Sequence, residues 1–292
     1  MSTSTGRRTV RANGVDICLQ THGDPAHPAV LLISGASTSM DMWPAPLCER
    51  LAEGGRYVVR YDHRDTGEST NYGAGAATYT IADLTDDAAA VLQVLDVEQA
   101  HVVGMSMGGV IGQLLALCHR HRVSTLTLVS TTPAFPPDPE RELPSMSPAD
   151  LEAFGAVERP DWTDRESVVE HLVASERVCA ARSVEFDDDA VRRTTRLVVD
   201  RSRDVAAMEN HFALADPDLP TLRLSQIGAP TLVVHGDEDP VFPVAHGEAL
   251  ADEIPGARLL TLRQLGHEVP PRIWDELVEA VLQHTGRNPA GD

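Results

Sequence analysis

The stretch HVVGMSMGGVIG, residues 101–112, runs from an apolar segment through Gly-x-Ser-x-Gly into a segment of small and apolar residues. Two interpretations fit this pattern. In one, Ser106 is a nucleophile on a sharp turn between a strand and a helix. In the other, the glycines only allow close packing at a strand-to-helix junction. The pattern alone does not separate the two, so the decision depends on the surrounding chain.

The length and charge of the chain restrict its fold and its partners. The chain has 292 residues, of which 42% are hydrophobic and 23% charged, and its formal net charge is −20. This length suffices for one large α/β domain or two small ones. An acidic surface repels nucleic acid and anionic lipid, so we expect no nucleic-acid and no membrane partner. The oligomeric state stays open, a homo-oligomer included.

The sequence shows no targeting or membrane segment. Residues 1–20 lack the apolar core of a secretory signal, and no run of about 18 apolar residues occurs. The four cysteines are far apart and form no Cys-x-x-Cys motif: Cys18, Cys48, Cys118 and Cys179. We therefore expect a cytoplasmic protein with reduced, mostly buried thiols.

Apolar runs alternate with helical patterns along most of the chain. Buried strands are predicted at 28–35, 56–62, 99–106 and 123–131, further strands within 229–240 and 257–268, and a half-exposed strand at 15–22. Helices are predicted at 46–54, 80–97, 107–122, 244–254 and 272–286. Repeated strand–helix–strand units indicate a mostly parallel sheet with helices on both faces.

The pattern changes between about residue 131 and about residue 227. A proline-rich opening is followed by helical, strongly charged segments such as 187–204. The acidic triplet Asp187 to Asp189 lacks the spaced ligands of a calcium loop, so we expect it to cap a helix and expect no metal ion. Residues 1–130 and 228–292 should form a catalytic α/β domain, and residues 131–227 a helical lid inserted after the sixth strand.

The elements predicted around Ser106 favour the nucleophile. The serine follows a buried strand and precedes a helix, which is the setting of a nucleophile elbow. Gly104 and Gly108 remove side chains that would clash across so tight a turn. The hydroxyl group would then project beside the N-terminus of the helix, whose free N–H groups and dipole suit a developing oxyanion.

A nucleophilic serine needs a general base, and position selects one of the twelve histidines. His267 follows the last predicted strand, in a loop at its C-terminal end, where catalytic groups gather in an open α/β sheet. His246 and His284 lie inside predicted helices, and His101 begins the strand that leads to Ser106. We therefore predict His267 as the base.

The histidine in turn needs an orienting acid. Asp237, Glu238 and Asp239 come after the apolar part of the strand predicted within 229–240, which gives the chain order serine, acid, histidine. A buried carboxylate on the imidazole fixes its tautomer and stabilises the imidazolium. We favour Asp239, because the other two would occupy the turn after the strand, and Asp237 stays the alternative.

Two backbone N–H groups are candidates for an oxyanion hole, those of Met107 and of Ala36. Such donors are typically worth about 3 kcal/mol each in the transition state. Gly35, Met42 and Trp43 lie in or just after the same loop as Ala36 and are candidates for lining the substrate pocket. Met42 and Trp43 could equally anchor the helix that follows.

Over roughly residues 10–285 the chain resembles the α/β-hydrolase superfamily, through LLISGAS, VVRYDHRDTGEST, HVVGMSMGGV, PTLVVHGDEDPVFP and LGHEVPP. Within it, VRYDHRDTGEST and HVVGMSMG are similar to bacterial methylesterases that remove a carbomethoxy group from anthracycline polyketides. The resemblance implies an α/β-hydrolase fold with an eight-stranded, mostly parallel sheet, and catalysis without a cofactor. Ser34-Gly35 stands where many relatives have His-Gly, which leaves a backbone donor unaffected.

These observations predict a serine hydrolase that cleaves a small-molecule carboxylic ester through an acyl-enzyme, with a methyl ester of a polyketide-type aromatic substrate as the specific expectation. A cofactor-free perhydrolase, a lactonase or a carbon–carbon bond hydrolase would use the same triad. Serine at the elbow argues against epoxide hydrolases and haloalkane dehalogenases, which use aspartate there. A non-catalytic binding protein of this fold is disfavoured, because all three triad candidates are present.

Overall fold

The computed structural model describes residues 6–135, 141–215, 217 and 222–286. In this part of the chain an eight-stranded sheet has the order β1-β2-β4-β3-β5-β6-β7-β8. The strands are β1 (Arg8–Ala12), β2 (Val15–His22), β3 (Ala29–Ile33), β4 (Tyr57–Tyr61), β5 (Ala100–Met105), β6 (Val123–Val129), β7 (Thr231–Gly236) and β8 (Arg258–Leu262). β2 pairs antiparallel with β1 and β4, and the other neighbours are parallel. The mostly parallel, eight-stranded sheet that the family resemblance implies is thereby confirmed.

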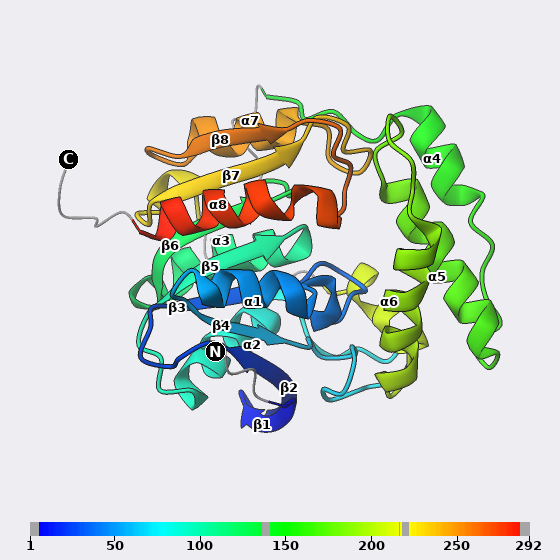
Figure 1. Ribbon diagram of the computed structural model, residues 1–292, viewed down its shortest axis with the longest axis horizontal. Coiled ribbons are helices and arrows are strands. Elements are labelled where there is room, and N and C mark those ends of the chain that lie inside the picture. The colour runs from blue at the N-terminus through cyan, green and yellow to red at the C-terminus, as the bar shows by residue number, and fades with distance from the viewer. Residues whose placement is uncertain (1–5, 136–140, 216, 218–221, 287–292) are drawn as a thin grey trace.

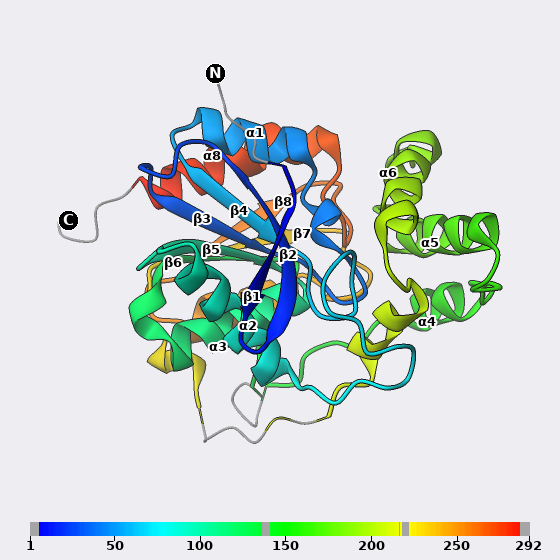
Figure 2. The same cartoon turned by 90° about the horizontal axis from the view of Figure 1, so that it is seen from below.

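Helices cover both faces of the sheet (Figures 1 and 2). They are α1 (Ala45–Glu53), α2 (Ile81–Val94), α3 (Met107–Cys118), α7 (Ala245–Glu253) and α8 (Trp274–Thr285). Side chains alternate across a strand, so β3 serves two apolar cores. Leu31 and Ile33 pack with residues of α2, α3 and α7, whereas Val30 and Leu32 pack with residues of α1 and α8. Burial on both faces explains why β3 reads as an unbroken apolar run.

The helix boundaries follow from local capping. Thr80 accepts a hydrogen bond from the N–H of Asp83, whose side chain accepts one from the N–H of Thr80 at the start of α2. The helix predicted at 107–122 instead ends at Cys118, and Arg120–Arg122 form a separate 3-10 helix. The edge strand β1 was not predicted, because its sequence RTVRA is polar and largely exposed.

Between β6 and β7 the chain leaves the sheet and forms α4 (Pro148–Gly155), α5 (Arg165–Cys179) and α6 (Asp188–Arg201). The 3-10 helices η3 (Ala206–Phe212) and η4 (Leu224–Gln226) follow. In Figure 2 the helices α4, α5 and α6 lie beside the sheet domain, and we refer to these three helices as the lid. Asp187 caps α6 by accepting from the N–H of Ala190, as expected for the acidic triplet. The helices among the described residues are too short or too polar to cross a membrane.

Candidate active site

Ser106 occupies a strained turn between β5 and α3. Its backbone has φ 52° and ψ −122°, a conformation that costs free energy for a residue with a side chain. The N–H of Ser106 donates to the carbonyl of Val129 at 3.0 Å, and the hydroxyl of Thr131 donates to the carbonyl of Ser106 at 2.6 Å. The neighbouring strand thus holds the turn at both of its peptide groups.

The glycines of the motif are required by contacts with backbone atoms. A Cβ atom on Gly104 would lie 2.1 Å from the carbonyl oxygen of Gly108, and one on Gly108 would lie 2.3 Å from that of Ile33. A Cβ on Gly35 would lie 3.4 Å from the Cβ of Ser106, so the loop after β3 runs directly past the serine. The glycines are therefore needed for close packing, and the turn that they allow leaves the partly exposed Ser106 beside the loop after β3.

The structure pairs His267, in the loop after β8, with Asp239, in the loop after β7. The imidazole Nδ1 lies 2.9 Å from Oδ2 of Asp239, whose other oxygen accepts from the N–H groups of Val241 and Phe242 at 2.9 and 2.8 Å. Burial by itself would raise the pKa of Asp239, but His267 and the N–H of Phe242 bring it below its ordinary value. Asp239 is thus a carboxylate that orients the imidazole, and among the described residues Nε2 of His267 has no hydrogen-bond partner.

Asp237, the alternative acid, forms its hydrogen bond with a residue other than His267. Its carboxylate accepts from the N–H of Gln264 at 2.6 Å and so joins the loop after β7 to the turn after β8. Glu238 accepts from the N–H of Ser183, beyond the lid helix α5, at 3.0 Å.

In the part of the chain that the structure describes, the hydroxyl of Ser106 forms no hydrogen bond. The hydrogen bond between a catalytic nucleophile and its base is often long, and it shortens only when substrate binds.

The two predicted oxyanion donors are unengaged. Neither the N–H of Ala36 nor that of Met107 donates a hydrogen bond within the described ranges. The N–H groups of Gly109 and Val110 instead donate to the carbonyl of Ser106, as the first helical turn requires. Two free N–H groups beside a strained serine are suited to bind a developing oxyanion.

Met42 and Trp43 have different surroundings. The sulfur atom of Met42 would lie 3.7 Å from a Cβ on Gly35 and is 3.5 Å from the hydroxyl oxygen of Thr38, so Met42 stays close to the loop after β3. Trp43 is 1% exposed and packs in the apolar core with Leu47. The structure therefore favours the anchoring role for Trp43 over pocket lining.

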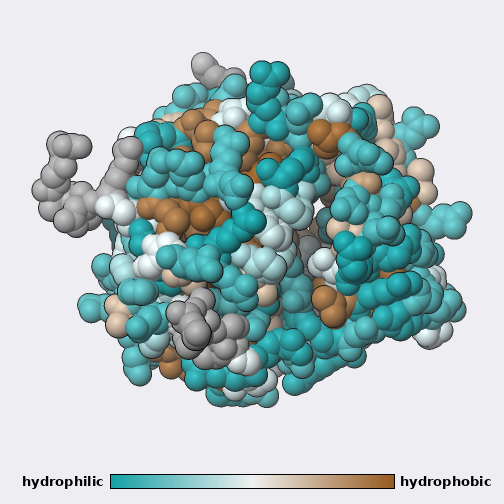
Figure 3. All heavy atoms as spheres, viewed as in Figure 1, coloured by the Kyte–Doolittle hydropathy of each residue, from teal (hydrophilic) through white to brown (hydrophobic). Residues whose placement is uncertain are grey.

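The lid touches the loop that carries His267. The N–H of His267 donates to the carbonyl of Cys179, the last residue of α5, at 2.7 Å. A Cβ on Gly266 would lie 2.4 Å from the same carbonyl oxygen, so the two segments are in backbone contact. The space-filling view is hollowed between the lid and the sheet domain (Figure 3).

Sequence reasoning missed two polar residues near the pair of His267 and Asp239. Glu176, one helical turn before Cys179, is exposed by surface area, yet the protein atoms around its carboxyl group raise its pKa, and the nearby His267 partly offsets this. His235, on β7, donates from Nε2 to the carbonyl of Phe242 at 2.7 Å, and burial lowers its pKa. Glu176 belongs to no motif, and His235 lies in the segment PTLVVHGDEDPVFP at a strand position that by itself indicates no role, so only the fold shows that both lie near the site.

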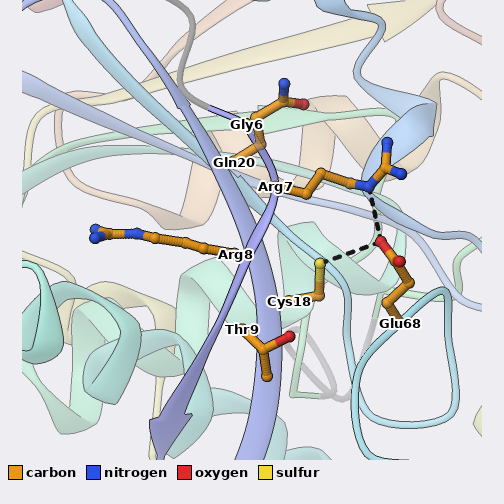
Figure 4. A pocket seen from close by; sticks show the side chains of 7 residues that line it. All are labelled: Gly6, Arg7, Arg8, Thr9, Cys18, Gln20 and Glu68. Atoms are coloured by element: carbon orange, nitrogen blue, oxygen red, sulfur yellow. Dashed lines mark hydrogen bonds and ion pairs between the residues drawn. The ribbon is translucent and has the colours of Figure 1, made fainter.

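A second hollow of about 440 Å³ lies over β1 and β2, where Arg7 donates to Glu68 at 2.7 Å (Figure 4). None of the predicted catalytic residues lines it. Among the described residues, no three His, Cys, Asp or Glu side chains are grouped so as to hold a metal ion.

The chain is similar to several known proteins. A family model described as alpha/beta hydrolase fold matches residues 28–270. A rhodomycin D methylesterase from Streptomyces sp. (strain C5) is 35% identical over 291 residues, which cover 95% of this chain and 97% of that protein. A 3-oxoadipate enol-lactonase from Acinetobacter baylyi is 26% identical and covers 94% of this chain and 96% of its own. The crystal structure of a hydrolase from Pseudomonas aeruginosa aligns with a TM-score of 0.71 at 27% identity, covering 97% of this chain and 99% of that one.

Proposed function

Because the chain belongs to the α/β-hydrolase family, we propose that it is a serine hydrolase that cleaves a small-molecule carboxylic ester. The observation that carries the proposal is the hydrogen bond between His267 and the buried carboxylate of Asp239, at the sheet edge where Ser106 occupies its strained turn. The unengaged N–H groups of Ala36 and Met107 support it.

In this mechanism the hydroxyl oxygen of Ser106 attacks the ester carbonyl while Nε2 of His267 takes the hydroxyl proton. The N–H groups of Ala36 and Met107 stabilise the negative charge on the carbonyl oxygen. His267 then gives the proton to the leaving alcohol, and the acyl group stays on Ser106. A water molecule repeats the sequence, releases the carboxylic acid and restores the serine. Asp239 stays ionised throughout and stabilises the imidazolium.

The proposed substrate is a methyl ester on a polyketide-type aromatic scaffold. The similarity to the rhodomycin D methylesterase supports this choice, because it spans 95% of the chain and therefore includes the lid as well as the catalytic motifs. A cytoplasmic location and the absence of nucleic-acid partners remain part of the proposal.

Replacement of the nucleophile tests the proposal. Ser106→Ala should abolish hydrolysis of p-nitrophenyl butyrate and of an aromatic polyketide methyl ester, because no hydroxyl remains to form the acyl-enzyme. Ser145→Ala, at an exposed position, is the matched control and should retain the wild-type rate. A wild-type rate in Ser106→Ala would contradict the assignment.

A lactonase is the second candidate, because the enol-lactonase relative also spans nearly the whole chain. Both reactions use the same acyl-enzyme and differ in whether the alcohol stays attached to the acyl group. Parallel assays with methyl esters and with five- and six-membered lactones separate them. Release of methanol at a higher kcat/KM than lactone opening supports the esterase, and the reverse order supports the lactonase.

A further inference from the structure

The loop that carries Ala36 contains a residue with a strained backbone, as does the turn at Ser106. Ser37 has φ 55°, in the left-handed region that residues with side chains seldom adopt. The hydroxyl of Thr38 donates to the carbonyl of Gly35 at 2.9 Å, which bridges the loop from its own side. A conformation of this cost persists only where surrounding contacts hold it.

His211, in η3 beyond the lid, supplies such a contact. Its Nδ1 accepts a hydrogen bond from the N–H of Ser37 at 3.0 Å, and its Nε2 lies 2.9 Å from the carbonyl oxygen of Arg64. An N–H group only donates and a carbonyl oxygen only accepts, so both bonds require the neutral tautomer with the proton on Nε2. Burial and the neighbouring His63 lower the pKa of His211 to about 4, although its bond to Arg64 opposes this. The imidazole is therefore neutral at physiological pH.

The imidazole of His211 is itself firmly held. It is 6% exposed and meets the rings of His63 and Tyr79 edge to face, with centroids 5.8 and 6.4 Å apart. The preceding residue, Asn210, donates to Oδ2 of Asp65 and to the carbonyl of Gly73, both at 2.8 Å. These partners all lie in the sheet domain, so Nδ1 has a fixed place relative to the sheet.

We propose that His211 is a positioning residue for the oxyanion hole, acting through the N–H of Ser37. Its bond fixes the peptide plane between Ala36 and Ser37, and this sets the direction of the adjacent N–H of Ala36. Because a Cβ on Gly35 would lie only 3.4 Å from that of Ser106, a small rotation of this loop moves the donor relative to the serine. The inference rests on the proposed ester hydrolysis, since it concerns an oxyanion formed at Ser106.

Side-chain amides separate the two bonds of the imidazole. In His211→Asn the amide oxygen can take the place of Nδ1 and still accept from Ser37, whereas in His211→Gln the amide nitrogen can replace Nε2 and donate only to Arg64. His211→Phe removes both bonds. We expect His211→Asn to keep kcat within about threefold of wild type, and the other two variants to lose about tenfold or more with little change in KM. This loss is a fraction of the about 10²- to 10³-fold that removal of an oxyanion donor costs.

A transition-state analogue distinguishes positioning from a general loss of structure. Alkyl boronic acids form a tetrahedral adduct with a nucleophilic serine, so their affinity should fall in step with kcat in His211→Gln and His211→Phe. Affinity for the carboxylic acid product should change little. The proposal would be overturned if all three variants lost kcat equally and if that loss followed the decrease in their Tm. Nitrogen-15 chemical shifts of wild-type His211 give a check that needs no variant, and a proton on Nδ1 at pH 7 would also overturn it.

Ser106→Ala keeps this test separate from that of the proposed function. If Ser106→Ala retains the wild-type rate, the ester hydrolysis proposed at Ser106 is wrong, and the role of His211 is overturned with it. If Ser106→Ala is inactive while His211→Gln and His211→Phe match the wild-type kcat, only the positioning role is overturned.

Discussion

The sheet domain and the lid are stabilised by different forces. Every residue of β3, β4 and β7 is buried, most of them in apolar cores. In the lid, α5 buries three valines, α6 buries only Thr195, and α4 has no buried residue. Ion pairs join α5 to α6 instead, including Arg165 with Asp200 and Arg196 with Glu166. Exposed pairs of this kind contribute little to stability, because solvent screens the charges and the long side chains lose conformational entropy. The sheet domain is therefore stabilised by many apolar contacts. We expect the position of the lid to depend on a few hydrogen bonds and ion pairs with the sheet domain.

One of those specific contacts is Arg201, the last residue of α6. Its guanidinium group donates to both carboxylate oxygens of Asp62 at 2.6 Å and also pairs with Asp41. The Arg201 side chain is 8% exposed and that of Asp62 is fully buried. Asp62 in turn accepts from the N–H of Met40, just beyond the loop that carries Ala36. This ion pair thus joins the end of the lid to the proposed oxyanion loop.

The largest expected effect concerns the acid, which lies wholly within the sheet domain. Asp239→Asn should lower kcat about 10⁴-fold, because an amide no longer selects the imidazole tautomer with a free Nε2. Asp237→Asn is the matched control and should stay within about threefold of wild type, the cost of a weakened turn. Steady-state hydrolysis of p-nitrophenyl butyrate measures both. A greater loss in Asp237→Asn would assign the acid to Asp237.

Arg201 gives the corresponding test for the lid. Arg201→Met leaves the buried carboxylate of Asp62 without its partner, so the free energy of unfolding should fall by about 3–5 kcal/mol. Arg196→Met removes an exposed pair of the same lid and should cost at most about 1 kcal/mol. Urea unfolding followed by fluorescence compares the two. Equal losses would show that the lid is not placed by this single pair.

The pH dependence of stability tests the sheet domain separately from the lid, because the buried imidazoles of His22 and His63 belong to the sheet domain. Burial lowers the pKa of each to about 4 from 6.5, helped at His22 by the charge of Arg60. Between these pH values the unfolded chain binds a proton that the folded chain does not. Stability should therefore fall as the pH drops from 6.5 to 4, by up to about 1.4 kcal/mol per pH unit for each group.

His22→Leu isolates one of these groups, because neither ring nitrogen of His22 has a hydrogen-bond partner within the described residues. Urea unfolding at pH 7.5 and at pH 5.5 should show a smaller loss of stability in this variant than in wild type. His27→Gln, at an exposed position, should leave the loss unchanged. An unaltered loss in His22→Leu would mean that His22 takes up its proton in the folded state as well.

The parts of the site that the sequence predicts are those with a local signal. The strained turn at Ser106 requires glycines on both sides, and a strand end followed by a loop locates His267. Trp43 carried no such signal, because an apolar residue after a loop reads the same in a pocket as in a core. Arg201 was one of many charges in a polar helix, and His211 was one histidine of twelve. Their partners, Asp62 and Ser37, lie far away in sequence and meet them only through the fold.

The hydrogen bond between His267 and Cys179 couples two events that are usually described apart. The residue proposed to move protons donates its own N–H to the end of a lid helix, so the lid cannot lift away there without releasing the loop of the base. In the proposed hydrolase, a displacement of α5 at Cys179 would therefore also pull on the backbone of the loop that holds the general base. The distance between α5 and the sheet domain would then affect the chemical step as well as access to Ser106.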